Sequence, residues 1–300
     1  MVKNTIKIVY ICIMKCRSCK KSIPANAKYC PHCGKAQHFN LFRFITRLIA
    51  LLSLIFAVTC AVLTYRYRIN IYQHLFNSTQ DKASEKAKID AVFDTNKKGI
   101  FGIDVSQYQG NIQWEKVKAF EQGPTINFVF IRASMGSTGK DTKFKENWRN
   151  AKKQGIIRGA YHYYRPDENS LKQAANFIQM VDLTKGDLIP VLDIEEIATK
   201  QPIDKLRLGL KRWLTKIEAH YGVKPMIYSS DAFYTLYLQT GDFDDYPIWI
   251  ANYNRVKSPW TNNWELWQFT EQGTIKGINH TVDFNVYDGD KADFNTLIIQ

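Results

Sequence analysis

The chain has 300 residues, 45% apolar and 13% aromatic, and its formal net charge is +13. This apolar content is sufficient for a packed core and excludes a disordered chain. The first 80 residues hold twelve Lys and Arg and no acid, which leaves 29 basic and 28 acidic residues for positions 81–300. The near-neutral remainder argues against nucleic acid as the ligand of the larger part of the chain.

Residues 1–15, "MVKNTIKIVYICIMK", form an N-terminal extension to which the sequence assigns no function. Its apolar stretch is too short to span a membrane. We hypothesise that translation begins at Met14, because "MKCRSCKK" would start the next segment cleanly.

Residues 16–37 contain two closely spaced Cys-x2-Cys pairs, formed by Cys16, Cys19, Cys30 and Cys33. Four thiolates at this spacing can surround a Zn²⁺ ion tetrahedrally, and metal binding would supply most of the folding free energy of so short a segment. Two disulfides or free thiols are the alternatives. The segment resembles the short zinc ribbons at the N-termini of many bacterial membrane proteins. A structural zinc ion is therefore the only cofactor that we expect, with none for catalysis.

Residues 44–68 are predicted to form a transmembrane helix with its flanks. Eighteen uncharged residues, Leu48–Tyr65, come close to the ~20 needed to cross a bilayer. The excess of Lys and Arg before this span places the N-terminus in the cytoplasm, where thiols also stay reduced. We therefore expect a single-pass protein of the cell membrane whose cysteine-free C-terminal part is extracellular. The expected partner of the ribbon is a cytoplasmic protein or the anionic inner leaflet.

Residues 69–98 are polar and are interpreted as a helical spacer without chemistry. From 99 to 300, eight strand-like runs are separated by helical patterns over 142–155, 170–181, 203–222 and 230–239. Strand and helix in alternation predict an α/β fold, an irregular TIM-like (β/α)8 barrel. The predicted strands cover 101–106, 127–134, 157–164, 188–195, 224–230, 246–253, 265–270 and 282–287.

Acidic side chains stand at the ends of several predicted strands. Asp193 and Glu195 lie two residues apart and so share a strand face, which a purely structural strand rarely shows because two buried carboxylates repel each other. Asp104 closes the first strand and Asp283 opens the last. Because active sites of such barrels form where strands end, we expect the four acids to converge. Late strand positions also supply candidate substrate contacts, which are Arg132, Tyr163, Tyr228, Trp249, Tyr253 and Gln268; His162, equally late, is interpreted as a hydrogen-bonded structural histidine.

A family resemblance follows from the motifs in chain order. "GIDVSQYQGNIQWEKVK", "FVFIRASMG", "GAYHYYRP", "PVLDIE", "PMIYSS", "WIANY", "LWQFT" and "VDFNVY" are similar to the pattern of family 25 glycoside hydrolases, the muramidase-type lysozymes. The resemblance covers nearly all of residues 99–290. It implies hydrolysis of the β-1,4 bond between N-acetylmuramic acid and N-acetylglucosamine in peptidoglycan, for cell-wall remodelling.

The resemblance also implies roles for the acids. Glu195 corresponds to the general acid and Asp193 to its partner at the anomeric carbon, while Asp104 and Asp283 shape the site. Whether Asp193 attacks directly or steadies a substrate acetamido group is left open by the sequence. The main alternative function is a catalytically silent peptidoglycan-binding module on the same barrel. A nucleic-acid-binding ribbon is disfavoured because aromatic residues do not interleave with its basic ones, and a secreted phage lysin is disfavoured because the chain looks anchored.

Overall fold

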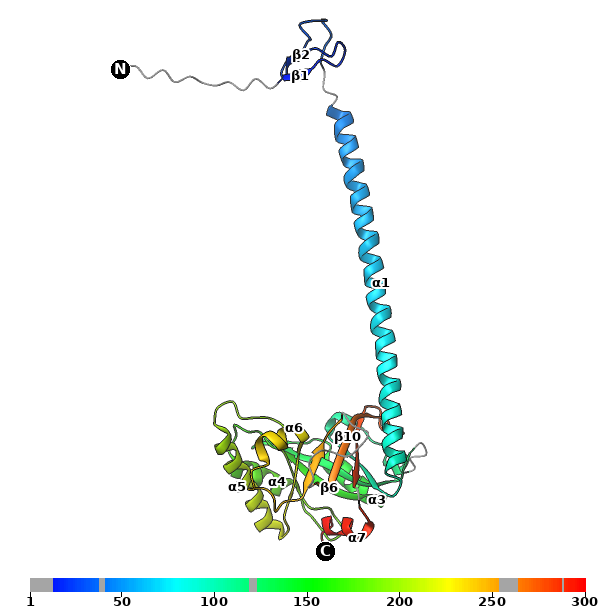
Figure 1. Ribbon diagram of the computed structural model, residues 1–300. Helices are drawn as coiled ribbons and strands as arrows, with labels where there is room; N and C mark the ends of the chain where they lie inside the picture. Colours follow the sequence, from blue (N-terminus) through cyan, green and yellow to red (C-terminus); the bar gives the residue numbers. More distant parts are fainter. Residues whose placement is uncertain (1–12, 38–40, 119–122, 254–263, 288) are drawn as a thin grey trace, which may run out of the picture. The chain divides into compact units, whose positions relative to one another are not determined.

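The computed structural model describes residues 13–37, 41–118, 123–253, 264–287 and 289–300 (Figure 1). The chain divides into two compact units, Met1–Ser78 and Thr79–Gln300. The first unit contains the cysteine pairs and the apolar helix, and the second contains the sheet. The C-terminal unit therefore begins at Thr79, about twenty residues before the domain start at residue 99 that the sequence predicted.

The first unit begins with a small antiparallel hairpin. Strand β1 (Ile13–Lys15) pairs with β2 (Ser22–Pro24), and Met14 lies opposite Ile23. Ile23 packs with Cys16 and Cys30 in a cluster that is almost inaccessible to solvent. Residues 13–15 thus belong to the cysteine-rich fold, although the sequence had assigned them to the extension; the rest of that extension, Cys12 included, lies outside the described residues.

Helix α1 runs without interruption over Leu41–Thr95. Within it, Ile45–Arg68 is long and apolar enough to cross a membrane, with a mean hydropathy of 2.4 and none of that window buried. Phe56 is 72% exposed and Leu54 61%. Apolar side chains this exposed favour a lipid environment over water, by length and composition.

The second unit is a closed barrel of eight strands. The strands follow one another around the barrel in the order β3-β11-β10-β9-β8-β7-β6-β4, and the pairing of β3 with β4 closes the ring. All neighbours are parallel except β11, which is antiparallel to both β10 and β3. Each of the eight predicted strands is present, as β3 (Ile100–Val105), β4 (Ile126–Met135), β6 (Ile157–Tyr163), β7 (Val191–Asp193), β8 (Met226–Ser230), β9 (Ile248–Ala251), β10 (Leu266–Gly273) and β11 (Val282–Tyr287), with the short β5 (Gly139–Lys140) paired to β4.

Helices follow the first five barrel strands, so strand–helix alternation extends from β3 to the segment after β8. β10 leads to β11 without a helix, through residues 274–281. The antiparallel last strand needs no crossover helix, because an antiparallel neighbour can be reached by a short loop. The helices are α2 (Trp114–Lys118), α3 (Phe144–Lys153), α4 (Ser170–Met180), α5 (Ile203–Tyr221), α6 (Asp231–Phe233) with a π-helical turn (Tyr234–Leu238), and α7 (Lys291–Phe294).

Alternation along each strand separates an inner row of side chains from an outer one. The inner rows of β4, β8 and β9 supply Phe128, Phe130, Met226 and Trp249 to one buried cluster. The barrel is narrow there: a Cβ on Gly102 would lie 2.4 Å from the ring of Phe128. Only a residue without a side chain fits beside that ring, so the interior is filled and the open space lies at the rim.

The last turns of α1 complete the outer core of the barrel (Figure 1). Ile89 and Val92 are buried, and the ring of Phe93 makes edge contacts with Phe101, Phe269 and Phe284 at centroid distances of 5.2, 5.8 and 5.6 Å. These rings belong to β3, β10 and β11, and the last two of these strands are joined without a helix. Part of the segment predicted as a spacer therefore packs on this side of the barrel.

Candidate active site and cysteine cluster

All ten side chains that the sequence singled out for the barrel site line one pocket of ≈ 220 Å³. They come from all eight strands of the barrel or from the two residues after a strand. The inner rows explain this convergence, because each row passes from apolar residues in the barrel to a polar residue at its rim: Phe130 to Arg132, Val191 to Asp193, Met226 to Tyr228, and Leu266 to Gln268.

Asp283 reaches this rim from the opposite chain direction. β11 is antiparallel to β3, with Asp283 paired to Asp104 in the register. The first residues of β11 therefore lie where the parallel strands end. Because β11 runs in the opposite direction to β3, Asp283 near the start of its strand lies at the same rim as Asp104 near the end of its strand.

Asp104 is buried and held by two side-chain amides. Its Oδ2 accepts a hydrogen bond from Gln268 Nε2 at 2.7 Å and one from Asn285 Nδ2 at 2.8 Å. Gln268 Oε1 in turn accepts from the hydroxyls of Tyr228 and Tyr253, at 2.8 and 2.5 Å. These aromatic donors fix the orientation of the amide, so the carboxylate of Asp104 is placed rigidly.

Asp104 and Asp283 form a carboxyl pair that retains a proton. Burial raises the pKa of Asp283 to about 10, and the neighbouring Asp104 adds to that rise. Burial raises the pKa of Asp104 only to about 6, because Asn285, Gln268 and Asp283 all donate to it. At neutral pH the geometry favours a protonated Asp283 that donates to an ionised Asp104.

Asp193 and Glu195 form a second pair. Asp193 is 4% exposed, and burial followed by the charge of Glu195 raises its pKa well above the usual range. Desolvation in the pocket also raises the pKa of Glu195, with Glu196 and Glu271 contributing. Glu195 lies two residues beyond the end of β7 and is accessible to solvent. The pair can therefore keep one proton beside an accessible oxygen atom, which is the requirement for a general acid.

Three supporting residues differ in their surroundings. Trp249 is 2% exposed, stacks on Phe130 at 4.8 Å and forms the floor of the pocket. Arg132 pairs with Asp141, its Nε lying 3.1 Å from Oδ2. His162 is fully buried between Ser134 and Gln173, and burial lowers its pKa to about 4. His162 is therefore structural, as expected.

Further residues line the pocket without having been singled out from the sequence. Tyr161 shares the inner row of β6 with Tyr163, so the two-residue alternation was a sufficient signal for it. Glu271 adds a fifth acid. Two register shifts in β10, on either side of Thr270, break the alternation there, and the sequence carries no signal of them. Tyr108 and Gln109 come from the turn after β3.

The four cysteines of the two Cys-x2-Cys pairs also converge. Their sulfur atoms all lie within 4.8 Å of one another, with Cys16 to Cys33 at 3.7 Å and Cys19 to Cys30 at 3.6 Å. These distances are far too long for disulfides but match the edge of about 3.8 Å of a tetrahedron with Zn–S bonds of about 2.3 Å. The cluster is thus of the right size and donor chemistry for a Zn²⁺ ion.

The two halves of this cluster repeat each other. In both, the residue after the second cysteine takes a left-handed conformation, φ 65° at Lys20 and 70° at Gly34, and donates its N–H to the carbonyl of the first cysteine. Backbone N–H groups of Ser18 and His32 point at the sulfurs of Cys16 and Cys30. Such donors stabilise thiolates, as a metal site requires.

The comparison with known proteins agrees with the pocket. The model of "Glycosyl hydrolases family 25" matches residues 103–278. The chain belongs to this family. It is therefore a glycoside hydrolase of the lysozyme type, and the matched residues run from within β3 to beyond the end of β10.

Among its relatives, the protein YegX of Escherichia coli strain K12 is 39% identical over 202 residues, which cover 66% of this chain and 73% of YegX. Lysozyme M1 of Streptomyces globisporus is 30% identical over 65% of this chain and 69% of its own length. A family 25 glycosyl hydrolase from Bacillus anthracis has a similar structure, with a TM-score of 0.62 and 30% identity over 68% of this chain and 95% of that one.

Proposed function

We propose that this family 25 hydrolase is a membrane-anchored muramidase. It cleaves the β-1,4 bond between N-acetylmuramic acid and N-acetylglucosamine in peptidoglycan during cell-wall remodelling. The carrying observation is the convergence of Asp104, Asp193, Glu195 and Asp283 around one pocket, in two pairs with raised pKa values. Aromatic walls beside carboxyl groups suit sugar rings and glycosidic chemistry.

In this proposal Glu195 is the general acid. Its position at the mouth of the pocket lets it protonate the bridging oxygen, and the raised pKa keeps a proton available on the pair. The leaving sugar departs with that proton, and positive charge develops at the anomeric carbon of the muramyl residue. Asp193 stabilises that charge from below, and Asp104 with Asp283 orients the sugar. Water then provides the anomeric hydroxyl of the new reducing end, and its second proton returns to Glu195.

The remaining pocket side chains are proposed to bind substrate. The sugar contacts the rings and hydroxyl groups of Tyr163, Tyr228 and Tyr253. Gln268 fixes the hydroxyls of Tyr228 and Tyr253 by hydrogen bonds, and Arg132 also lines the pocket. The anchor is helix α1, with the N-terminus cytoplasmic and the barrel extracellular. In the cytoplasm, the cysteine cluster binds structural zinc and contacts a protein partner or the inner leaflet.

Release of reducing ends from purified peptidoglycan by the full chain tests this function. Glu195→Gln removes the proton donor while keeping shape and hydrogen bonding, and we expect a fall of roughly 10²–10⁴-fold in kcat. Glu115→Gln on α2 is the matched control, since Glu115 is exposed and lines none of the pockets described for the barrel. A wild-type chain that binds peptidoglycan without releasing reducing ends would instead be a binding module.

A further inference from the structure

A second pocket of ≈ 640 Å³ opens beside the first. Three of its residues, Tyr108, Arg132 and Tyr163, line both pockets. The two pockets are therefore adjacent and share these side chains as a common wall. The remaining lining residues are Met135, Arg165, Pro166, Asp167, Glu168, Glu196 and Lys200.

The wall of the second pocket is preformed by bonds between the segments after β6 and β7. Asp167 accepts hydrogen bonds from the N–H groups of Thr199 and Lys200, both at 3.0 Å, and from Thr199 Oγ1 at 2.6 Å. Across the same gap, Tyr163 OH donates to Glu196 Oε1 at 3.0 Å. A ligand entering this pocket meets a surface that is already ordered, so the entropic cost of binding is reduced.

The carboxylates of this pocket accept hydrogen bonds from the protein, and two of its cations, Arg165 and Lys200, are exposed. Asp167 holds the loop as described, and Glu168 accepts from the N–H of Ser137 at 2.6 Å. Arg165 makes one exposed ion pair with Glu168 at 3.4 Å and leaves half of its side chain in solvent. Lys200 is exposed as well. Arg165 and Lys200 are therefore cationic groups that a ligand in this pocket can reach.

Arg132 occupies the junction of the two pockets. It uses its Nε to bind Asp141, and its guanidinium carbon lies 4.8 Å from the centre of the Tyr108 ring. Held on two sides in this way, the guanidinium is a fixed hydrogen-bond donor at the passage between the pockets.

We propose that the second pocket binds the peptide that peptidoglycan carries on its muramyl residues. This inference rests on the proposed function. With a muramyl ring in the first pocket, its lactyl ether reaches the junction, where Arg132 donates to the lactyl carbonyl. The peptide continues into the second pocket, and its free carboxylates pair with Arg165 and Lys200. The enzyme thereby distinguishes peptide-bearing glycan from glycan stripped of peptide.

Hydrolysis of two soluble substrates by the full chain in detergent tests this proposal. One substrate is peptide-bearing glycan, and the other is the same glycan after an amidase has removed its peptides. We expect the wild type to show a kcat/KM about 3–10-fold higher on the peptide-bearing glycan, the size that two accessible ion pairs can supply. The double variant Arg165→Ala/Lys200→Ala should reduce that ratio to near 1.

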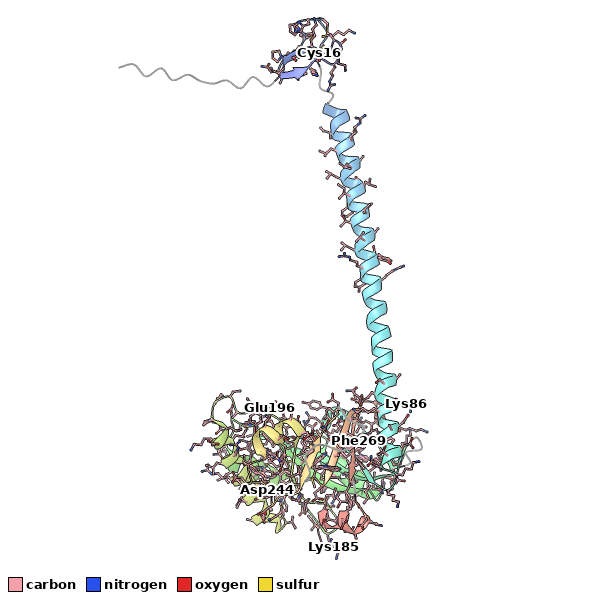
Figure 2. All side chains as sticks on the ribbon, in the orientation of Figure 1. Cys16, Lys86, Lys185, Glu196, Asp244 and Phe269 are labelled. Atoms are coloured by element: carbon pink, nitrogen blue, oxygen red, sulfur yellow. The ribbon has the colours of Figure 1, made fainter. Side chains whose placement is uncertain are left out.

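Lys185→Ala is the control, because Lys185 is equally exposed and lies at the opposite end of the barrel from Glu196 (Figure 2); its ratio should equal that of the wild type. Amidation of the peptide carboxylates should lower the wild-type ratio as the double variant does. A wild-type ratio near 1, or a double variant with an unchanged ratio, would overturn the peptide subsite while leaving the muramidase intact. If the wild type hydrolysed neither substrate, the proposed muramidase function itself would be overturned.

Discussion

Asp283 lies opposite Asp104 in the antiparallel pairing of β11 with β3, so two carboxyl groups meet at the rim of the barrel. Burial raises the pKa of both: to about 10 for Asp283, where the neighbouring Asp104 adds to the rise, and only to about 6 for Asp104, where the hydrogen bond from Asp283 opposes it. An acid whose pKa is higher in the folded than in the unfolded state makes folding less favourable as pH rises between the two values. This pair is therefore expected to make the barrel more stable in mild acid than in mild base.

Asp283→Asn should remove most of that dependence. The amide keeps a donor for Asp104 but carries no ionisable proton, so the wild type loses stability between pH 5 and pH 9 and the variant loses less. We expect a difference on the order of 1–3 kcal/mol at pH 9, with Tm shifts of roughly 2–4 °C per kcal/mol. Thermal unfolding of both chains across this pH range measures it. Parallel curves for the two chains would show that Asp283 does not retain a proton.

The end of helix α1 should be required by the barrel. Phe93→Ala removes a ring that contacts Phe101, Phe269 and Phe284, and we expect a loss of about 2–4 kcal/mol in the free energy of unfolding. Lys86→Ala, on an exposed position of the same helix (Figure 2), should cost less than about 0.5 kcal/mol.

The same contacts make a prediction for truncated chains. A fragment of residues 79–300 should fold cooperatively, whereas a fragment of 99–300 exposes Phe101, Phe269 and Phe284 and should aggregate or melt at much lower temperature. Denaturant unfolding of the two fragments compares them. Equal midpoints would mean that the helix end lies on the barrel without stabilising it.

The cysteine cluster should bind zinc independently of the barrel. Cys30→Ser/Cys33→Ser removes two of four thiolates, so the full chain should lose its bound zinc while hydrolysis in detergent stays within about twofold of the wild type. Metal analysis and an activity assay on the same sample decide this. If hydrolysis were lost together with zinc, the activity of the barrel would depend on the cysteine cluster, and the two units would not be independent.

The protonation of Asp193 bears on the nucleophile. When Glu195 holds the proton that the pair shares, Asp193 is a buried carboxylate beside it, and we infer that this carboxylate orients the acetamido group of the muramyl residue, which attacks the anomeric carbon. Glycan with de-N-acetylated muramyl residues should then be cleaved about 100-fold more slowly, ~3 kcal/mol in the barrier. Equal rates on both glycans would favour direct attack by Asp193.

The strands, and the convergence of the ten side chains on one pocket, could be predicted from the sequence because both depend on local alternation; the roles of these side chains stay predictions. In a run such as 127–134, alternate residues are apolar and the last residue of that row is polar. The apolar residues of these rows fill the barrel interior, and the polar ones lie at its rim. The direction of β11 was not predictable in this way, since pairing depends on partners far apart in the chain.

Two other features had no local signal. Glu271 lines the pocket because register shifts in β10 change which side chains face it, and no pattern of residues in the sequence predicts these shifts. Residues 69–98 are mostly polar, and the three apolar residues that pack on the barrel, Ile89, Val92 and Phe93, are too few to predict this packing from the sequence.

The central claim is that Glu195 delivers a proton to the oxygen that links muramic acid to glucosamine. Mass spectrometry of the products released from purified peptidoglycan tests it most directly. We predict disaccharide peptides with a new reducing end on muramic acid from the wild type, and none above background from Glu195→Gln. A reducing end on glucosamine, or undiminished product from the variant, would contradict it.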